Sequence, residues 1–494
     1  MRWERQGTLS SHWTIALRTH QSLVGICLLL FFQLFLAYRI PLSEDEAYYW
    51  CWAQDLSRGY FDHPPMVAYW IRLTTSIFGN STMAIRLSGI MGTVGILLFI
   101  RRLGVQGGLF IMIALSPLVL FGGVLITPDT PFLFFFAAYL IWVTSIHGLF
   151  IEWGGDPVTR VYRRSPVPLI QWAAGGLLLG LGALSKYTML LAAGCTVLIL
   201  VSKYRFQSWF RGLAVFALVA FLCILPVILF NRDHDWVSFR FQWNHAMIKE
   251  GFSWQYIGRY LGGQIALIGL LPFLMFPWVL LSKSHWNQDP ILATCFYFYV
   301  PLFLFFFYQG SQTNFEANWS LMTYIGFWAM AQRLIQVSSF RYLNQFILGI
   351  SFLPPLLASG LILWTLFSPK PILTAQQNRL ARIETQDRVT RQVAHDSKQK
   401  YAGSPLFATT YQWTASLRYQ GVHTEQLEGA GRPSQFTIKP VDPCQTSSIL
   451  VVSPSTQPPS EHLQCFSRWT QLEEYPFVVQ GQTLDTMVLR RYEK

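Results

Sequence analysis

Charged residues are scarce in this chain. Asp, Glu, Lys and Arg together make up 13% of its 494 residues, whereas a soluble globular protein usually carries about 25%. The apolar residues, 52% of the chain, are grouped in runs whose lengths approach the ~20 residues needed to cross a ~30 Å hydrocarbon core. Because lipid offers no partner to unpaired backbone groups, an open sheet is excluded there. The composition therefore predicts a polytopic α-helical membrane protein.

Further absences narrow the function. The chain has no GxxxxGK[ST] motif and no GxGxxG after a strand, which disfavours an ATP-driven mechanism and sugar transfer from a soluble nucleotide donor. The net charge of +12 comes from short Lys and Arg clusters between apolar runs and not from a long basic stripe, so we predict no nucleic-acid partner. No internal repeat is evident, which weakens the interpretation as a transporter built from inverted repeats.

The apolar runs predict about eleven membrane helices. They lie roughly at residues 21–40, 84–100, 105–126, 131–149, 168–184, 187–201, 212–230, 257–281, 291–308, 317–332 and 344–367. A basic, polar N-terminus precedes the first run and no small-residue cleavage site follows it, so we expect an uncleaved first helix and not a removed signal peptide.

Charge asymmetry between the connecting loops predicts the orientation. With the N-terminus in the cytoplasm, the cytoplasmic loops carry most of the cations, as the positive-inside rule requires: Arg101, Arg102, Arg160, Arg163, Arg164, Lys203, Arg205, Arg211, Lys283, Arg333 and Arg341. Most acids fall in the outer loops: Glu44, Asp45, Glu46, Asp55, Asp62, Asp129, Asp233, Asp235, Glu250 and Glu316. Because acids do not set topology, their position is separate information and indicates function on the outer side.

Two domains are expected. Residues 1–367 form the multi-span domain, with a first outer loop at about 41–83, and an odd number of spans leaves residues 368–494 outside as a small α/β domain. In that domain FTIKP and SSILVVSP are predicted strands, and TYQWTASLRYQ is a predicted short helix. Cys444 and Cys465 either form a disulfide there, if the compartment is oxidising, or remain free thiols.

The segment PLSEDEAYYWCWAQDLSRGYFDHPP, residues 41–65, is the most acidic part of the chain. Such a segment beside a membrane is costly unless it lines a water-filled site. Asp45 and Glu46 are adjacent and cannot share one face, so we expect one to face a cavity and the other to bind a cation, a metal or a backbone donor. A carboxylate at the membrane surface is suited to act as general base toward a hydroxyl. The competing interpretation is a solvated cluster that caps a helix start.

Other outer segments supply further candidates. Asp62 and His63 lie in GYFDHPP, where His63 is either a metal or phosphate ligand or part of a structural loop. Asp129 in ITPDTP is either a functional acid or a turn residue. In GLGALSKYT, Lys186, next to Tyr187, either binds phosphate or snorkels to the interface.

Two later loops complete the candidates. NRDHDWVSFRFQWNH offers Arg232 and Arg240, whose guanidinium groups could hold a phosphate in forked geometry. NFEANW adds Glu316 and Asn318 at another outer loop.

These motifs together resemble the membrane glycosyltransferases of the C-type fold. The nearest resemblance is to the bacterial branch of the dolichyl-phosphate-mannose protein mannosyltransferase superfamily, which includes the lipid A aminoarabinose transferases. DEAYYW is similar to that family's Asp-Glu motif and FDHPP to its His-Pro-Pro motif. TPDTP, GLGALSKYT, NRDHDWVSFRFQ and NFEANW are similar to later blocks in the same order, so the resemblance covers roughly residues 20–330. SQFTIKP is similar to a less specific segment of some bacterial members, and NWS stands where the family often has NW followed by Pro.

The resemblance implies a donor, a reaction and residue roles. The donor is a polyprenyl-phosphate sugar, and the reaction inverts the anomeric carbon by direct displacement. Asp45 is implied to be the general base and Asp129 the second catalytic acid. Lys186, with Arg232 or Arg240, is implied to hold the lipid phosphate. A divalent metal is left open, with Glu46 and His63 as candidate ligands; no other cofactor is predicted.

The sequence therefore predicts an inverting glycosyltransferase of the bacterial inner membrane. It would act on its outer face, with a cell-envelope lipid such as lipid A, a glycan or a protein as acceptor. Substrate-binding residues are predicted to be Glu46, Asp62, His63, Lys186, Tyr187, Arg232, Arg240, Glu316 and Asn318. A transporter or flippase of lipid-linked sugars is the non-enzymatic alternative, although acids buried within spans, which it would favour, are scarce. A polymerase or ligase using a diphosphate-linked glycan is a second alternative. Such proteins usually carry a long outer loop late in the membrane region, and this chain shows none.

Overall fold

The computed structural model of the chain describes residues 23–494 except 151–166, 205, 207–208, 248–249, 282–288, 338–340, 369–371 and 458–462. Arg160, Arg163, Arg164, Arg205 and Lys283, which entered the prediction of orientation, lie outside the described residues, as does the polar segment 1–22. The chain divides into two compact units, each assembled from three stretches of sequence. Unit 1 consists of Met1–Phe35, Gly89–Leu229 and Asn244–Gly360, and unit 2 consists of Leu36–Ser88, Phe230–Trp243 and Leu361–Lys494.

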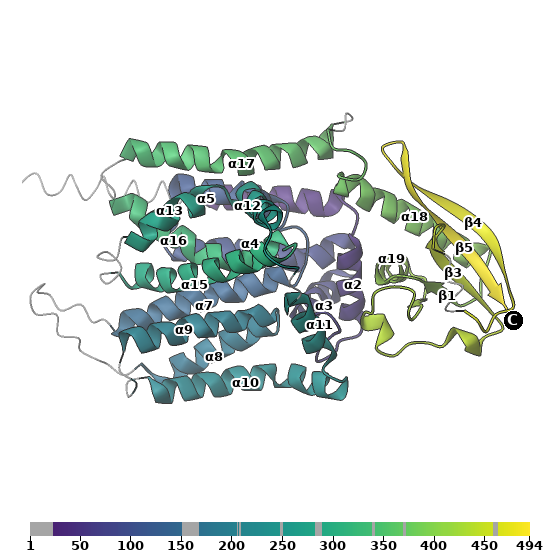
Figure 1. The fold of residues 1–494 in the computed structure, drawn as a ribbon, viewed down its shortest axis with the longest axis horizontal. Coiled ribbons are helices and arrows are strands. Elements are labelled where there is room, and N and C mark those ends of the chain that lie inside the picture. Colours follow the sequence, from purple (N-terminus) through teal and green to yellow (C-terminus); the bar gives the residue numbers. More distant parts are fainter. Residues whose placement is uncertain are drawn as a thin grey trace, which may run out of the picture. The chain divides into compact units, whose positions relative to one another are not determined.

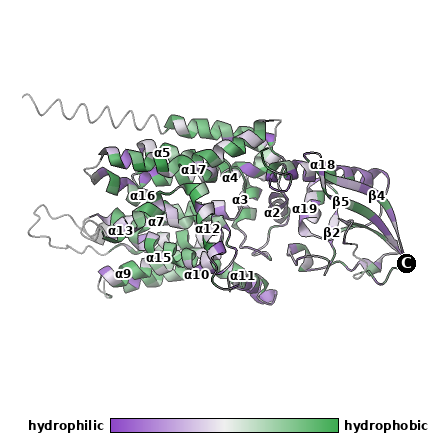
Figure 2. Cartoon of the chain, turned by 45° about the horizontal axis from the view of Figure 1, so that its top comes forward, coloured by the Kyte–Doolittle hydropathy of each residue, from purple (hydrophilic) through white to green (hydrophobic). Residues whose placement is uncertain are grey.

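Unit 1 is built from helices (Figure 1). A helix at Leu23–Arg39 is followed by α4 (Thr82–Arg102), α5 (Gly107–Ala114), α6 (Pro117–Leu120), α7 (Asp129–Phe150), α8 (Leu169–Ala183), η1 (Tyr187–Met189), α9 (Leu190–Lys203), α10 (Phe210–Asp233), α12 (Trp254–Ile268), α13 (Leu271–Leu281), α15 (Pro290–Gln312), η3 (Ala317–Ser320), α16 (Met322–Val337) and α17 (Arg341–Phe367). The first helix, α4, α10 and α17 each run on into residues of unit 2. Figure 2 shows that hydrophobic residues dominate most of these helices.

Five of the described helices are long and apolar enough to cross a membrane, or up to seven if each of two bent pairs is counted as one span. The protein is therefore a polytopic α-helical membrane protein, as predicted, but the count of eleven spans is not confirmed by this criterion. Each predicted run does contain helix. The run at 105–126 is divided between α5 and α6, because Pro117 begins a new helix after Ser116, and α8 is a shorter apolar helix.

The run at 257–281 is broken at Gly269, where α12 and α13 meet at an angle of 98°. Gly269 has a φ of +91°, in the region that side-chain-bearing residues rarely adopt. A Cβ atom there would also lie 2.3 Å from the backbone oxygen of Ser351 on α17. The amide of the next residue, Leu270, donates to that same oxygen at 3.0 Å. The apolar pattern continues through this point, so composition alone could not locate the break.

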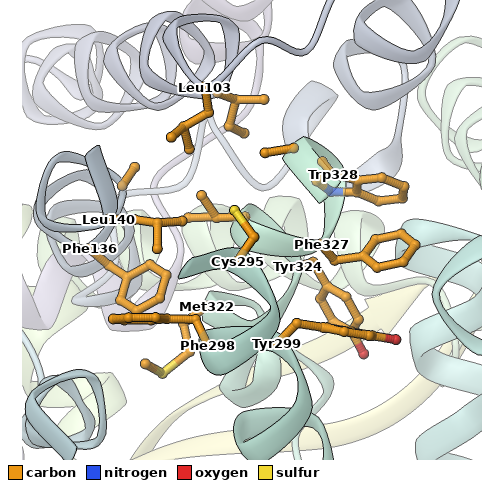
Figure 3. Close-up of a cluster of buried hydrophobic side chains, with 14 of the residues drawn as sticks. Leu103, Phe136, Leu140, Cys295, Phe298, Tyr299, Met322, Tyr324, Phe327 and Trp328 are labelled. Atoms are coloured by element: carbon orange, nitrogen blue, oxygen red, sulfur yellow. The ribbon is translucent and has the colours of Figure 1, made fainter. Parts of the chain in front are cut away.

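The core of unit 1 is formed where α7, α15 and α16 pack together (Figure 3). Phe136 on α7 contacts Phe298 on α15, with ring centroids 5.9 Å apart. Tyr299 on α15 contacts Phe327 on α16, at 4.9 Å. This packing fixes the start of α7, where Asp129 lies.

Unit 2 combines helices with one sheet. Its helices are α2 (Glu44–Gln54), α3 (Met66–Phe78), most of α11 (Val237–Met247), α18 (Arg379–Gln399) and α19 (Tyr411–Tyr419), with short turns η4 (Gln435–Thr437) and η5 (Pro443–Gln445). The strands are β1 (Leu406–Ala408), β2 (Thr424–Gln426), β3 (Ser448–Pro454), β4 (Arg468–Val479) and β5 (Gln482–Glu493).

The sheet has the order β2-β1-β3-β5-β4, with β1 parallel to β2 and β3, and β5 antiparallel to β3 and β4. Side chains alternate across a strand, and β3 buries both of its faces. Leu450 and Val452 pack with α18 and α19, whereas Ile449 and Val451 pack with Phe466 and other apolar residues on the opposite face. This arrangement explains why SSILVVSP is a nearly continuous apolar run.

The structure confirms the small α/β domain, the strand SSILVVSP and the helix TYQWTASLRYQ. The predicted strand FTIKP is wrong, because Ser434 caps a 3₁₀ turn over Gln435–Thr437 instead. Ser434 and Thr437 exchange hydrogen bonds between side chain and backbone, which a β-branched composition does not reveal. The boundary between residues 367 and 368 stays a prediction; within unit 2, residues 36–88 and 230–243 join the C-terminal part.

A disulfide joins Cys444 and Cys465, which lie 21 residues apart. Replacing both with serine is expected to lower the free energy of unfolding of the C-terminal domain by roughly 3 kcal/mol, because the bridge restricts the unfolded chain. Amide hydrogen exchange along β3 and β5 in the full-length protein would measure the loss. Cys27→Ser, which removes an exposed free thiol, is the control, and unchanged exchange in the double variant would contradict the expectation.

Candidate active site

In unit 2 the acidic segment forms the start of α2. Ser43 is the N-cap of this helix and forms a capping box with Glu46, so the pattern S-E-D-E begins a helix at Glu44. The acids in the first turn also favour this end of the helix electrostatically. The helix-capping interpretation therefore applies to Glu46. Glu46 and the neighbouring Asp45 have different partners.

Glu46 is buried and paired with Arg86 on α4. Arg86 donates from Nε to Glu46 Oε1 at 2.8 Å and from Nη2 to Oε2 at 2.7 Å, and the two side chains are 1% exposed or less. The same guanidinium donates to the backbone oxygens of Ile40 at 2.7 Å and Pro41 at 2.8 Å. This bidentate pair fixes the chain where it enters α2. Both oxygens of the predicted metal candidate Glu46 are thus engaged by a cation.

Asp45 is exposed on α2. Its Oδ1 accepts a hydrogen bond of 3.0 Å from the hydroxyl of Tyr411 at the start of α19. Within the described ranges, Oδ2 has no hydrogen bond or ion pair with the protein. One acid, Glu46, binds a cation as expected. Asp45 is exposed and hydrogen-bonded to Tyr411, and a cavity in front of it stays a prediction.

Asp62 lies behind this surface and is 4% exposed. Its Oδ2 accepts from the hydroxyl of Tyr48 at 2.7 Å, and its Oδ1 accepts from Nη1 of Arg432 at 2.6 Å. Burial raises the pKa of Asp62 above its ordinary value, although Arg432 and Tyr48 act in the opposite direction. Half-buried His63 is adjacent, with Nδ1 3.5 Å from Nε2 of Gln242 on α11. Asp62 therefore links the segment at residues 41–65 to the C-terminal part of unit 2.

The two arginines expected to bind phosphate are exposed in unit 2. Arg232 donates to Oδ1 of Asp233 from Nε at 3.1 Å and from Nη2 at 2.9 Å. Arg58 reaches Oδ2 of the same carboxylate at 3.3 Å. Arg240 is exposed on α11. The guanidinium of Arg232 is thus already partly neutralised, whereas the exposed position of Arg240 leaves it accessible from solvent.

Unit 1 holds a second polar group, in which Asp129, Lys186 and Asn318 meet. Asp129 is the first residue of α7, and its Oδ1 accepts from Nζ of Lys186 at 2.6 Å. Its Oδ2 accepts from Nδ2 of Asn318 at 2.8 Å. The charged side chains are 13% and 15% exposed. Lys186 and Asn318 lie 57 and 189 residues after Asp129 along the chain, so three separate motifs meet at this carboxylate.

Two further candidates of unit 1 lie beside these residues in sequence. Tyr187 begins η1, directly after Lys186, and Glu316 is exposed immediately before η3. In the described part of the chain, no group of three or more His, Cys, Asp or Glu side chains could hold a metal ion. The metal roles of Glu46 and His63 stay untested predictions.

Sequence reasoning missed several residues that hold these candidates: Tyr48, Arg86, Gln242, Tyr411 and Arg432. Arg86 carried a signal, because it is a cation inside an apolar run, and such residues usually have a buried partner. Tyr411 and Arg432 carried none, since a Tyr or an Arg in a polar domain is usually an ordinary surface residue. Their partners become evident only when α19 and the segment before η4 are placed against α2.

Comparisons with known proteins agree with this architecture. A family model described as dolichyl-phosphate-mannose-protein mannosyltransferase matches residues 62–148, a range that contains Asp62, Arg86 and Asp129. The chain is 26% identical over 293 residues to the lipid A galacturonosyltransferase RgtD of Rhizobium johnstonii. That match covers 57% of this chain and spans 58% of the relative's length.

Solved structures of ArnT from Cupriavidus metallidurans have the same fold. The apo structure superposes with a TM-score of 0.61 at 13% identity, covering 98% of both chains. The structure bound to undecaprenyl phosphate gives a TM-score of 0.62 at 14% identity, covering 97% of this chain and 98% of the other. Together the comparisons confirm the resemblance predicted from the motifs: the chain is similar to the dolichyl-phosphate-mannose-protein mannosyltransferases and the ArnT-like glycosyltransferases, and it has their C-type membrane fold.

Proposed function

We propose that the protein is an inverting glycosyltransferase that moves a sugar from a polyprenyl-phosphate donor to a cell-envelope acceptor. The observation that supports this most directly is the separation of Asp45 from Glu46. Glu46 is held in a buried ion pair with Arg86. Asp45 is exposed, and its Oδ1 accepts a hydrogen bond from Tyr411, whereas its Oδ2 has no hydrogen bond or ion pair with the described residues. The fold of ArnT, solved with undecaprenyl phosphate bound, supports a lipid-phosphate donor. The name of the relative RgtD makes lipid A the first acceptor to test.

The proposed reaction is a single displacement. The acceptor oxygen bonds to the anomeric carbon as its proton passes to Asp45, and the bond from that carbon to the phosphate oxygen breaks. The electron pair leaves with the polyprenyl phosphate, so the site needs a cation at the phosphate and a base at the nucleophile. Lys186, held by Asp129 and Asn318, is the proposed phosphate ligand, with Arg240 and Arg232 as further candidates. The remaining predicted residues, Asp62, His63, Tyr187 and Glu316, are proposed to support substrate binding.

The proposed location is the bacterial inner membrane, with the N-terminus cytoplasmic and residues 368–494 on the periplasmic side. The apolar helices support a multi-pass membrane protein. The orientation rests on the distribution of Lys and Arg among the loops. A disulfide in the C-terminal domain is in keeping with an oxidising compartment.

Purified protein mixed with a polyprenyl-phosphate-linked sugar and lipid A tests the function directly. Mass spectrometry is expected to find lipid A heavier by one sugar residue, with an equal amount of free polyprenyl phosphate. The NMR coupling of the new anomeric proton is expected to show inversion. Movement of the intact donor between the leaflets of proteoliposomes, with no covalent product from lipid A, glycan or protein acceptors, would instead establish the transporter alternative.

Lys186→Gln is expected to raise the KM for the lipid donor by about ten- to a hundredfold, because a hydrogen bond to a charged group contributes roughly 1.5–3 kcal/mol. Steady-state kinetics with varied donor would measure this change. Lys398→Gln removes an exposed lysine of α18 that donates to the backbone of Gln420, and it should leave the KM unaltered. A donor KM that is equal in both variants would argue against phosphate binding by Lys186.

A further inference from the structure

The C-terminal part of unit 2 reaches the proposed catalytic acid through α19. This helix lies against α2, with Tyr419 bonded to Thr82 at 2.9 Å near its end and Tyr411 bonded to Asp45 at its start. The ring of Tyr411 is also packed against that of Tyr48, with centroids 4.7 Å apart. Because Tyr48 is one turn after Asp45 on α2, the same helix face both supports the Tyr411 ring and presents the acid.

Arg432 also contacts the Tyr411 ring. Its guanidinium lies 4.7 Å from the centroid of Tyr411 and 5.1 Å from that of Phe241 on α11, within the range of cation–π attraction. Its Nη1 is simultaneously bonded to Asp62, which accepts from Tyr48. Tyr411 is therefore fixed by a closed series of contacts through Tyr48, Asp62 and Arg432.

The hydroxyl of Tyr411 is a donor at neutral pH. Burial and the nearby Asp45 carboxylate raise the pKa of Tyr411 above its ordinary value, so the phenol keeps its proton. Among the residues that the structure describes, the phenol donates its hydrogen to Oδ1 of Asp45. This bond limits rotation of the carboxylate and leaves Oδ2 directed away from the phenol.

On the basis of the function proposed above, we infer that Tyr411 is a positioning residue of the transferase, through which the C-terminal domain orients Asp45 toward the acceptor hydroxyl. Tyr411 does not take part in the proton transfer itself. Its hydrogen bond selects the rotamer of Asp45 in which Oδ2 receives the proton. A misplacement of a catalytic group by about 1 Å can lower the rate roughly 10²-fold.

Tyr411→Phe tests the inference, because it keeps the ring and its packing against Tyr48 and the Arg432 guanidinium but removes the hydroxyl, and with it the hydrogen bond to Asp45 and the hydroxyl's interaction with Arg432. The kcat is expected to fall roughly ten- to a hundredfold, the range for losing a hydrogen bond to a charged group, with the KM values of donor and acceptor unchanged. Tyr419→Phe is the matched control: it removes a hydroxyl from the same helix whose partner is Thr82, and it should keep the wild-type kcat.

A double-mutant cycle with Asp45→Glu separates positioning from general support of the fold. Glutamate keeps a base but moves it, so removing the Tyr411 hydroxyl should cost less in that background than in the wild type; additive losses would overturn the inference. It would also be overturned by an unchanged kcat in Tyr411→Phe, by an acceptor KM that rises while kcat stays constant, or by a lower thermal midpoint than in Tyr419→Phe. Absence of transfer by the wild-type protein would instead reject the proposed function.

Discussion

Asp45→Asn is expected to lower kcat by about 10²- to 10⁴-fold, the usual contribution of a general base. Asparagine has nearly the shape of aspartate, and its amide oxygen can still accept the hydrogen bond from Tyr411. Only the capacity to take a proton from the acceptor hydroxyl is lost. The KM for the lipid donor should change little, because the phosphate is assigned to other residues. Initial rates of sugar transfer by the purified protein would measure the effect.

Asp55→Asn provides the matched control for this experiment. Asp55 is also exposed and lies in the same acidic segment, at the C-terminal end of α2. Its substitution changes the net charge of the segment by the same amount without touching Tyr411, so it should preserve kcat. Transfer at the wild-type rate by folded, membrane-inserted Asp45→Asn would refute the proposed base, whereas equal losses in both variants would indicate a general electrostatic effect of the segment.

Arg86→Met is expected to destabilise the region around α2 by about 3–5 kcal/mol, because it leaves the Glu46 carboxylate buried without its cation. Arg86 also satisfies the backbone oxygens of Ile40 and Pro41, which lose their donors in this variant. The loss should be visible as faster amide hydrogen exchange along α2 and as a lower yield of folded protein. No loss of protection would show that water or another group replaces the guanidinium.

Arg58→Met is the control for the buried pair. Arg58 faces Asp233 across 3.3 Å, but the two side chains are 57% and 35% exposed, and exposed ion pairs contribute only about 0–1 kcal/mol. Removing Glu46 together with Arg86, as Arg86→Met with Glu46→Leu, should restore part of the stability because no unpaired charge remains. A double variant less stable than Arg86→Met alone would contradict this account of the pair.

Several features of the fold could be predicted from residue patterns. Long apolar runs such as that of α10 could be predicted as membrane helices, because their hydropathy and length match those needed to cross the hydrocarbon core. The strand at β3 was evident for a similar reason, since its apolar residues are buried on both faces. The bend at Gly269 and the short turn at Ser434 were not evident, because each depends on a local backbone contact and not on mean hydropathy.

The candidate site was predictable only in part. Asp129, Lys186 and Asn318 were each singled out by motif, and the structure brings them together. The position of Arg86 in an apolar run indicated a buried partner but not that the partner is Glu46, and no pattern indicated that Asp45 would be held by Tyr411. These partners lie 40 and 366 residues away along the chain. Pairings over such separations depend on how whole helices and strands pack together, and this packing cannot be deduced from one short motif at a time.

Asp45 leaves the ribosome 366 residues before Tyr411. At the usual ~5–20 residues per second, roughly 20–70 s separate the synthesis of the acid from that of its hydroxyl partner. Throughout this interval the carboxylate of Asp45 lacks the hydrogen bond from Tyr411, so on the role proposed for Tyr411 a nascent chain is expected to be inactive or slow. Truncation before residue 411 would leave the protein in that state permanently. On the proposed role of Tyr411, transfer at the full rate is therefore expected only after α19 has been synthesised and has packed against α2.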